Sequence, residues 1–144
     1  MTDHDLIDIL HTQRTIAVVG LSPKPERPSY GVAQYMQRMG YRIVPVNPGQ
    51  SEILGERCYA SLREIPFAVQ MVNVFRNEED VLPIAQQAVA IGAQCFWQQL
   101  GIANLEADHL VRAAGLRSVM DLCLKIEHRR LALAPWMLEA IPAT

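Results

Sequence analysis

Residues 15–31 read Thr15-Ile-Ala-Val-Val-Gly-Leu-Ser-Pro-Lys-Pro-Glu-Arg-Pro-Ser-Tyr-Gly31. The opening run is apolar and rich in β-branched residues and ends at Gly20, a pattern typical of a strand that is buried on both faces. After a proline-rich loop, apolar residues recur at helical spacing at Val32, Tyr35, Met36 and Met39. Ser29 is suited to cap that helix and Gly40 to end it. The stretch therefore predicts a strand, a basic loop and a helix in succession.

The same alternation continues along the rest of the chain. Further apolar runs predict strands at 42–46, 69–75, 94–98 and 117–120, with helices between them. Asn104 is expected to cap the last of these helices, and two more helices are expected near residues 3–13 and from Asp121 onward. Pro45 favours an edge position for the second strand, because proline cannot donate a ladder hydrogen bond. Strands that alternate with helices form a parallel sheet covered on both faces. We therefore expect a single domain, residues 1–144, with an α/β Rossmann-like fold: a doubly wound five-stranded parallel sheet of order 3-2-1-4-5 in three α/β/α layers.

The loop after the first strand is the strongest candidate for a ligand site. In a doubly wound sheet the ligand lies beyond the carboxyl ends of the strands. There, Gly20 permits a tight turn, Ser22 and Ser29 supply hydroxyls, and Lys24 and Arg27 supply positive charge. The helix that follows directs its dipole and free N–H groups at the loop. The loop has neither the G-x-G-x-x-G spacing nor a Walker A motif, yet its position predicts a phosphate-rich ligand.

The ends of the other strands supply further candidates. Asn47 stands where a NAD-binding fold typically has an acidic residue that grips the ribose diol. A neutral residue there favours a ligand phosphorylated on its ribose, such as coenzyme A or NADP, although Asn-Pro-Gly is equally typical of a simple turn. Phe75 and Arg76 could flank a pantetheine arm or adenine and neutralise phosphate, or could be a core-edge aromatic and a solvated arginine. Gln98 and Gln99 could hydrogen-bond a ligand amide or cap a loop.

Composition excludes several classes of protein. A formal net charge of −2 argues against nucleic-acid and membrane-surface binding, which need a basic face. The three separated cysteines do not form a disulfide framework. The polar N-terminus and the lack of a long apolar stretch predict a cytoplasmic protein. We expect neither a metal site nor catalytic residues, because no histidine has a partner near the ligand edge and no cluster has zinc spacing.

Several short motifs follow one another in a specific order: residues 20–30, Val44-Pro-Val-Asn-Pro48, Val74-Phe-Arg76, Trp97-Gln98, Gly101-Ile102 and Asp121-Leu-Cys-Leu-Lys-Ile-Glu127. Over roughly residues 5–132 the chain resembles the small stand-alone CoA-binding proteins of bacteria and archaea, a family similar to the CoA-binding domain of the succinyl-CoA synthetase alpha subunit. The resemblance implies that coenzyme A lies on the first loop and the ends of strands two to four. Phosphates would lie near residues 20–30, the nucleotide near residues 46–48, and an opposite wall at residues 75–76. The expected cofactor-binding residues are Gly20, Leu21, Ser22, Lys24, Arg27, Ser29, Tyr30, Val46, Asn47, Pro48, Phe75, Arg76 and Gln98.

Two functions fit this sequence. The first is a module that binds CoA or acyl-CoA as a carrier, sensor or regulator without its own catalysis, either as a possible homodimer or with an unknown protein partner. The alternative is an NAD(P)-dependent oxidoreductase or another nucleotide-dependent enzyme. The synthetase's phosphohistidine has no counterpart here, which argues against ligase activity. Cys123 lies near a predicted helix start at the ligand edge, where its thiol could form a mixed disulfide with that of CoA, or be a buried structural cysteine.

Overall fold

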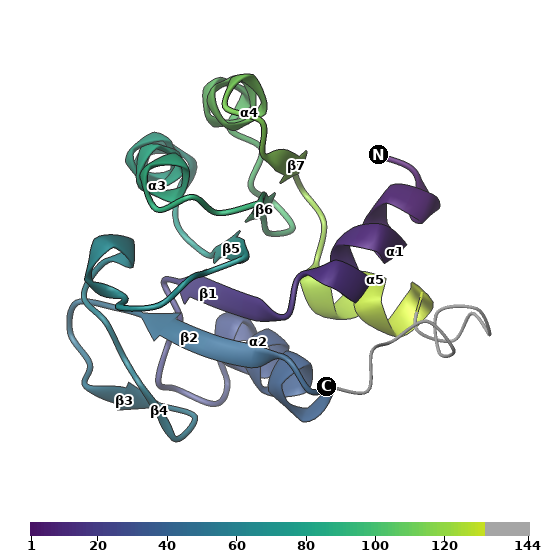
Figure 1. The fold of residues 1–144 in the computed structure, drawn as a ribbon. Coiled ribbons are helices and arrows are strands. Elements are labelled where there is room, and N and C mark those ends of the chain that lie inside the picture. Colours follow the sequence, from purple (N-terminus) through teal and green to yellow (C-terminus); the bar gives the residue numbers. More distant parts are fainter. Residues whose placement is uncertain (132–144) are drawn as a thin grey trace.

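Five parallel strands form the central sheet, in the order β2-β1-β5-β6-β7 (Figure 1). The computed structural model describes residues 1–131 of the chain. The strands are β1 (Thr15–Val19), β2 (Arg42–Val46), β5 (Met71–Val74), β6 (Cys95–Gln98) and β7 (Arg117–Val119). All residues of β5 and β6 are buried, as their continuous apolar runs predict for strands covered on both faces.

The Rossmann pattern is confirmed, with one correction to the assignment of its strands. Beyond β2, the place of the third Rossmann strand is marked by a single parallel bridge between Val46 and Tyr59. When that segment is counted as the third strand, the sheet follows the order 3-2-1-4-5, and β7 follows as a sixth strand. The run predicted at 69–75 instead pairs with β1, where Ala17 is opposite Val72. A fully buried run needs neighbours on both edges, and the place beside β1 provides them.

The connection between β2 and β5 explains this arrangement. It contains a short hairpin of β3 (Glu52–Ile53) and β4 (Glu56–Arg57), followed by the 3-10 helix η1 (Leu62–Glu64). Only Tyr59 pairs with the sheet in this segment, and its N–H donates to the carbonyl oxygen of Pro45 over 3.0 Å. Pro45 therefore lies on the outermost of the five strands, as its missing N–H predicts.

Helices cover both faces of the sheet, so the three layers are confirmed. Helices α1 (Asp3–Thr12), α2 (Pro28–Arg38) and α5 (Leu124–Leu131) pack on one face, and α3 (Glu78–Ala90) and α4 (Leu105–Ala113) on the other (Figure 1). Ile16 and Val18 of β1 face the first group, whereas Ala17 and Val19 face the second. This is the alternation that a strand imposes on successive side chains.

Two predicted helix starts are wrong. Helix α2 begins at Pro28, whose fixed φ suits the first turn, so its N-cap is Arg27 and Ser29 lies inside the helix. Helix α5 begins at Leu124 and not at Asp121, because Asp121 has a left-handed backbone with φ of 57°. By contrast, Asn104 caps α4 as expected, accepting a hydrogen bond from Ala107 N over 2.9 Å. No helix within residues 1–131 has both the length and the apolar character to cross a membrane.

Candidate functional site

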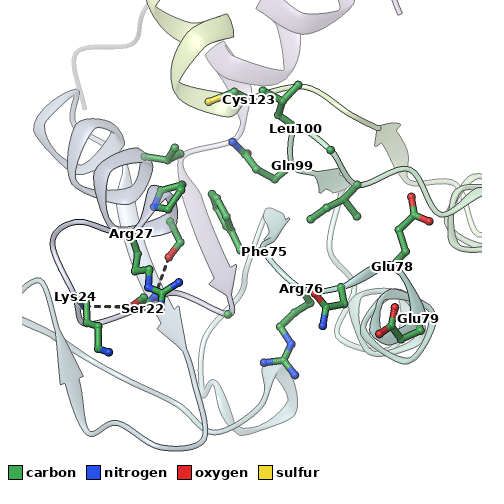
Figure 2. A pocket seen from close by; sticks show the side chains of 17 residues that line it. Ser22, Lys24, Arg27, Phe75, Arg76, Glu78, Glu79, Gln99, Leu100 and Cys123 are labelled. Carbon is green, nitrogen blue, oxygen red and sulfur yellow. Dashed lines mark hydrogen bonds between the residues drawn. The ribbon is translucent and has the colours of Figure 1, made fainter.

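A cavity of about 1100 Å³ lies at the carboxyl ends of the strands (Figure 2). Its walls come from the β1–α2 loop and the start of α2, the end of β5 and the start of α3, the loop after β6, and the residue before α5. The lining residues are Gly20, Ser22, Lys24, Arg27, Pro28, Ser29, Val32, Phe75, Arg76, Asn77, Glu78, Glu79, Gln99, Leu100, Gly101, Ile102 and Cys123. This is the edge at which ligands of doubly wound folds bind.

Gly20 allows the first loop to pass close to the end of β5. Its φ is +87°, and a Cβ placed there would lie 2.3 Å from the carbonyl oxygen of Phe75. The N–H of Gly20 donates to the carbonyl oxygen of Val46 over 2.9 Å. Any side chain at this position would therefore push the loop away from its neighbours, which is the reason for glycine here.

Hydrogen bonds that backbone N–H groups donate to two serine side chains hold the loop against the start of α2. The Ser29 hydroxyl oxygen accepts from Ser22 N over 3.0 Å, and the Ser22 hydroxyl oxygen accepts from Lys24 N over 3.1 Å. Arg27 N in turn donates to the carbonyl oxygen of Lys24 over 3.0 Å. The folded loop brings Lys24 and Arg27, both exposed, to the rim of the cavity. The two cations predicted from the sequence therefore share one wall with the helix N-terminus.

Charge is unevenly distributed around the cavity. Lys24 and Arg27 lie on the loop side, Glu78 and Glu79 lie on the α3 side, and Arg76 is placed between them (Figure 2). The Arg76 guanidinium is half-exposed and only 3.8 Å from a carboxylate oxygen of Asp80, a surface pair of small energetic value. Arg76 can therefore turn toward an anion in the cavity with little loss.

A second, smaller cavity of about 280 Å³ adjoins the first and shares Arg76 with it. Val46 and Pro48 line this second space, as does the segment that leads into η1. Asn47, the residue between Val46 and Pro48 in the sequence, lines neither cavity, and its side chain is engaged in hydrogen bonds. Its Nδ2 donates to the carbonyl oxygen of Leu21 over 3.0 Å and its Oδ1 accepts from Gly49 N over 2.9 Å. Asn47 thus ties the first loop to the turn after β2.

Besides Asn47, three other predicted site residues do not line either cavity. Gln98 is fully buried, and its side-chain amide both donates to and accepts from the backbone of Asn104, over 3.1 Å and 2.7 Å. Leu21 is also fully buried and packs in the core. Tyr30 is half-buried against the same core face. The geometry therefore gives these three residues a structural role.

Other lining residues were not among the predicted site residues. Gln99, directly after Gln98, lines the cavity together with Leu100 and Ile102. The alternation of a strand places neighbouring side chains on opposite faces, but it did not indicate which of the two glutamines faces the ligand edge. Cys123 also lines the cavity, in agreement with the sequence hypothesis that placed it there.

The histidines lie away from both cavities. None of the four histidines lines either cavity. His128 is buried in α5, where its Nδ1 is 2.8 Å from the Tyr35 hydroxyl, and burial lowers its pKa. In the part of the chain that the structure describes, no group of three or more histidine, cysteine or acidic side chains could hold a metal ion.

Known proteins are similar to this chain in sequence and in fold. Residues 14–129 match the family described as "CoA binding domain". The uncharacterized protein YneT of Bacillus subtilis is 41% identical over 124 residues, which cover 86% of this chain and 92% of that protein. The solved structure of a hypothetical protein from Pyrococcus horikoshii superposes on this chain with a TM-score of 0.89 and 39% sequence identity. The match covers 92% of this chain and 93% of that protein.

A more distant similarity concerns a longer enzyme. The acetate–CoA ligase [ADP-forming] II of Archaeoglobus fulgidus is 33% identical over 72 residues, which are 49% of this chain and only 10% of the ligase. The family match spans most of the chain and includes every strand of the central sheet. The chain therefore belongs to the family of CoA-binding domains.

Proposed function

We propose that this protein binds coenzyme A or acyl-CoA in the two adjoining cavities and serves as a carrier, sensor or regulatory module without catalysis of its own. The observation that carries the proposal is the first loop. Its serines fold it so that Lys24 and Arg27 line the same cavity as the start of α2. Two cations at a helix N-terminus form a site for a diphosphate, within a chain of the CoA-binding domain family.

The remaining parts of the ligand have a place on either side of the diphosphate. The smaller cavity, with Val46 and Pro48, suits the adenosine, and the shared Arg76 suits a phosphate on the ribose. The larger cavity continues past Phe75 to Gln99 and Cys123, which suits the pantetheine arm. Asn47 does not carry the negative charge that would grip an unmodified ribose diol, and this favours CoA over NAD.

The binding proposal is tested by titration calorimetry with CoA, acetyl-CoA, NADP and NAD. We expect CoA or acetyl-CoA to bind most tightly. The double variant Lys24→Ala/Arg27→Ala should lose about 10-fold or more in CoA affinity, because charge-assisted hydrogen bonds to phosphate are lost. Arg38→Ala, at the other end of the same helix, is the control and should bind like the wild type. Tighter binding of NAD than of CoA, or equal loss in the control, would contradict the proposal.

The absence of catalysis needs a separate measurement. Acetyl-CoA is incubated with the protein in water and with a small amine acceptor, and release of the CoA thiol is followed with a thiol reagent. We expect the rate to remain at the background of the buffer. Release that is proportional to protein concentration and continues over many turnovers would instead make the protein an enzyme.

A further inference from the structure

Cys123 is held at the wall of the larger cavity by the residues on either side of it. The carbonyl oxygen of Leu122 accepts a hydrogen bond from Trp97 Nε1 over 2.8 Å, and Leu124 N donates to Gln99 Oε1 over 3.3 Å. The neighbours of Cys123 are thus fixed to β6 and to the residue that follows it. Cys123 itself is half-buried and lines the cavity, so its thiol is presented to whatever the cavity holds.

Gln99 gives an independent indication that a ligand reaches this end of the cavity. Only 6% of the residue is exposed. Its Oε1 accepts from Asn73 Nδ2 and from Leu124 N, both over 3.3 Å, which fixes the orientation of the amide. Its Nε2 is directed into the cavity beside Cys123 (Figure 2) and has no hydrogen-bond partner among residues 1–131. This donor opens to the cavity and is free to donate to an acceptor of a bound ligand.

The two ends of the cavity differ in chemistry. Lys24 and Arg27 lie at one end and Gln99 and Cys123 at the other, with Phe75 between them (Figure 2). The inference rests on the proposed function, in which the cations hold the diphosphate. The pantetheine arm then runs past Phe75 toward Gln99, with amide carbonyls that can accept from Nε2. This arm ends in a thiol, which arrives at the side of the cavity where Cys123 lies.

We propose that Cys123 is a thiol–disulfide exchange site for coenzyme A. The Cys123 thiol loses its proton to solvent, and the thiolate attacks one sulfur of a bound CoA disulfide. The sulfur–sulfur bond of that disulfide breaks, a new bond forms between Cys123 and CoA, and the second CoA leaves as a thiolate that takes up a proton. No other oxidant is required. A small thiol reverses the step and releases CoA, so the protein stores CoA in a reducible form.

The other two cysteines do not compete for this reaction. Cys95 is fully buried in β6, and burial raises the pKa of its thiol to about 12. Cys58 is 8% exposed, its Sγ donates to the carbonyl oxygen of Asn47 over 3.4 Å, and burial raises its pKa. Exchange requires an accessible thiolate, so modification should be confined to Cys123.

The experiment uses the reduced full-length protein and CoA disulfide, with intact-mass spectrometry and peptide mapping. We expect one CoA per chain, bound at Cys123 and removed by dithiothreitol. Cys123→Ser should lose the adduct, and Cys58→Ala should retain it. The reaction should be about 10-fold or more faster than with cystamine, a small disulfide without a nucleotide, because bound CoA disulfide is held near the thiol. Lys24→Ala/Arg27→Ala should slow only the reaction with CoA disulfide.

The results separate this proposal from the binding function. Reduced CoA is titrated into the wild type and into Cys123→Ser, and both should bind it, because the variant keeps Lys24 and Arg27 at the other end of the cavity. If both proteins bind CoA but the wild type forms no adduct, or forms it equally at Cys58, the exchange site is refuted and the binding function stands. If neither protein binds CoA, the binding function itself fails. Equal rates with CoA disulfide and cystamine would show a merely exposed thiol and would also refute the exchange site.

Discussion

Replacement of Gly20 by alanine tests how closely the first loop must approach β5. A Cβ at this position would lie 2.3 Å from the carbonyl oxygen of Phe75 and 2.9 Å from Cδ of Arg76. The arginine side chain can move. The carbonyl cannot move freely, because Phe75 N donates to the carbonyl oxygen of Val19 over 2.9 Å. The substitution must therefore shift backbone at the wall of the cavity.

The expected loss of stability has two parts. The positive φ of +87° at Gly20 costs an alanine about 1–2 kcal/mol, and forcing an extra methyl against packed neighbours costs about 1–3 kcal/mol. Gly20→Ala should therefore lower the free energy of unfolding by about 2–5 kcal/mol. Gly92 is a matched control, because its φ is +77° and a Cβ there meets nothing within 4 Å. Gly92→Ala carries only the first part of the loss.

Urea denaturation measures the free energy of unfolding of both variants, and titration calorimetry measures their affinity for CoA. We expect Gly20→Ala to lose at least about 1 kcal/mol more than Gly92→Ala. It should also weaken CoA binding about 10-fold, because the displaced loop carries the groups that we propose to bind the phosphates. Gly92→Ala should leave CoA affinity unchanged. Equal losses of stability in the two variants would refute the claim that Gly20 is required by close backbone approach.

Three further predictions concern residues outside the loop from Gly20 to Ser29. Gln98→Ala should lower the free energy of unfolding by about 2–3 kcal/mol, because it removes a fully buried side chain and both of its hydrogen bonds to the half-buried backbone of Asn104. By titration it should change CoA affinity less than threefold (about 0.6 kcal/mol). A large loss of affinity at full stability would return Gln98 to the binding site. Gly31→Ala, in α2 with open space around its Cβ, should stabilise the protein by about 0.5–1 kcal/mol in urea denaturation. Burial, with a smaller contribution from the charge of Arg14, lowers the pKa of His128 below 6.5. As the pH falls below 6.5, His128 is therefore protonated more readily in the unfolded chain than in the folded one. Stability should therefore be complete above about pH 6.5 and decline below it; His128→Gln should flatten that decline between about pH 7.5 and pH 5.5, and an unchanged slope would contradict the assignment.

The sequence alone determined the fold class and the place of the loop that we propose to bind phosphate. Continuous apolar runs identify buried strands because both faces of a parallel sheet are covered. The loop from Gly20 to Ser29 follows the first strand directly, so its place at the carboxyl edge depends only on local order along the chain. Ser22, Lys24, Arg27 and Ser29 were predicted at this edge, and all of them line the larger cavity.

Tertiary structure decided which strands are neighbours and which side chains reach the cavity. The apolar pattern at 69–75 predicts a strand but does not indicate which strand it pairs with. Its place beside β1 depends on contacts between segments far apart in the sequence. Gln98 and Gln99 are adjacent in sequence, yet one binds the backbone of Asn104 and the other faces the cavity. The position of Cys123 depends on hydrogen bonds that its neighbours Leu122 and Leu124 make with Trp97 and Gln99, more than 20 positions earlier in the sequence. Sequence patterns report local periodicity and burial, whereas the meeting of distant segments is settled only when the whole core packs.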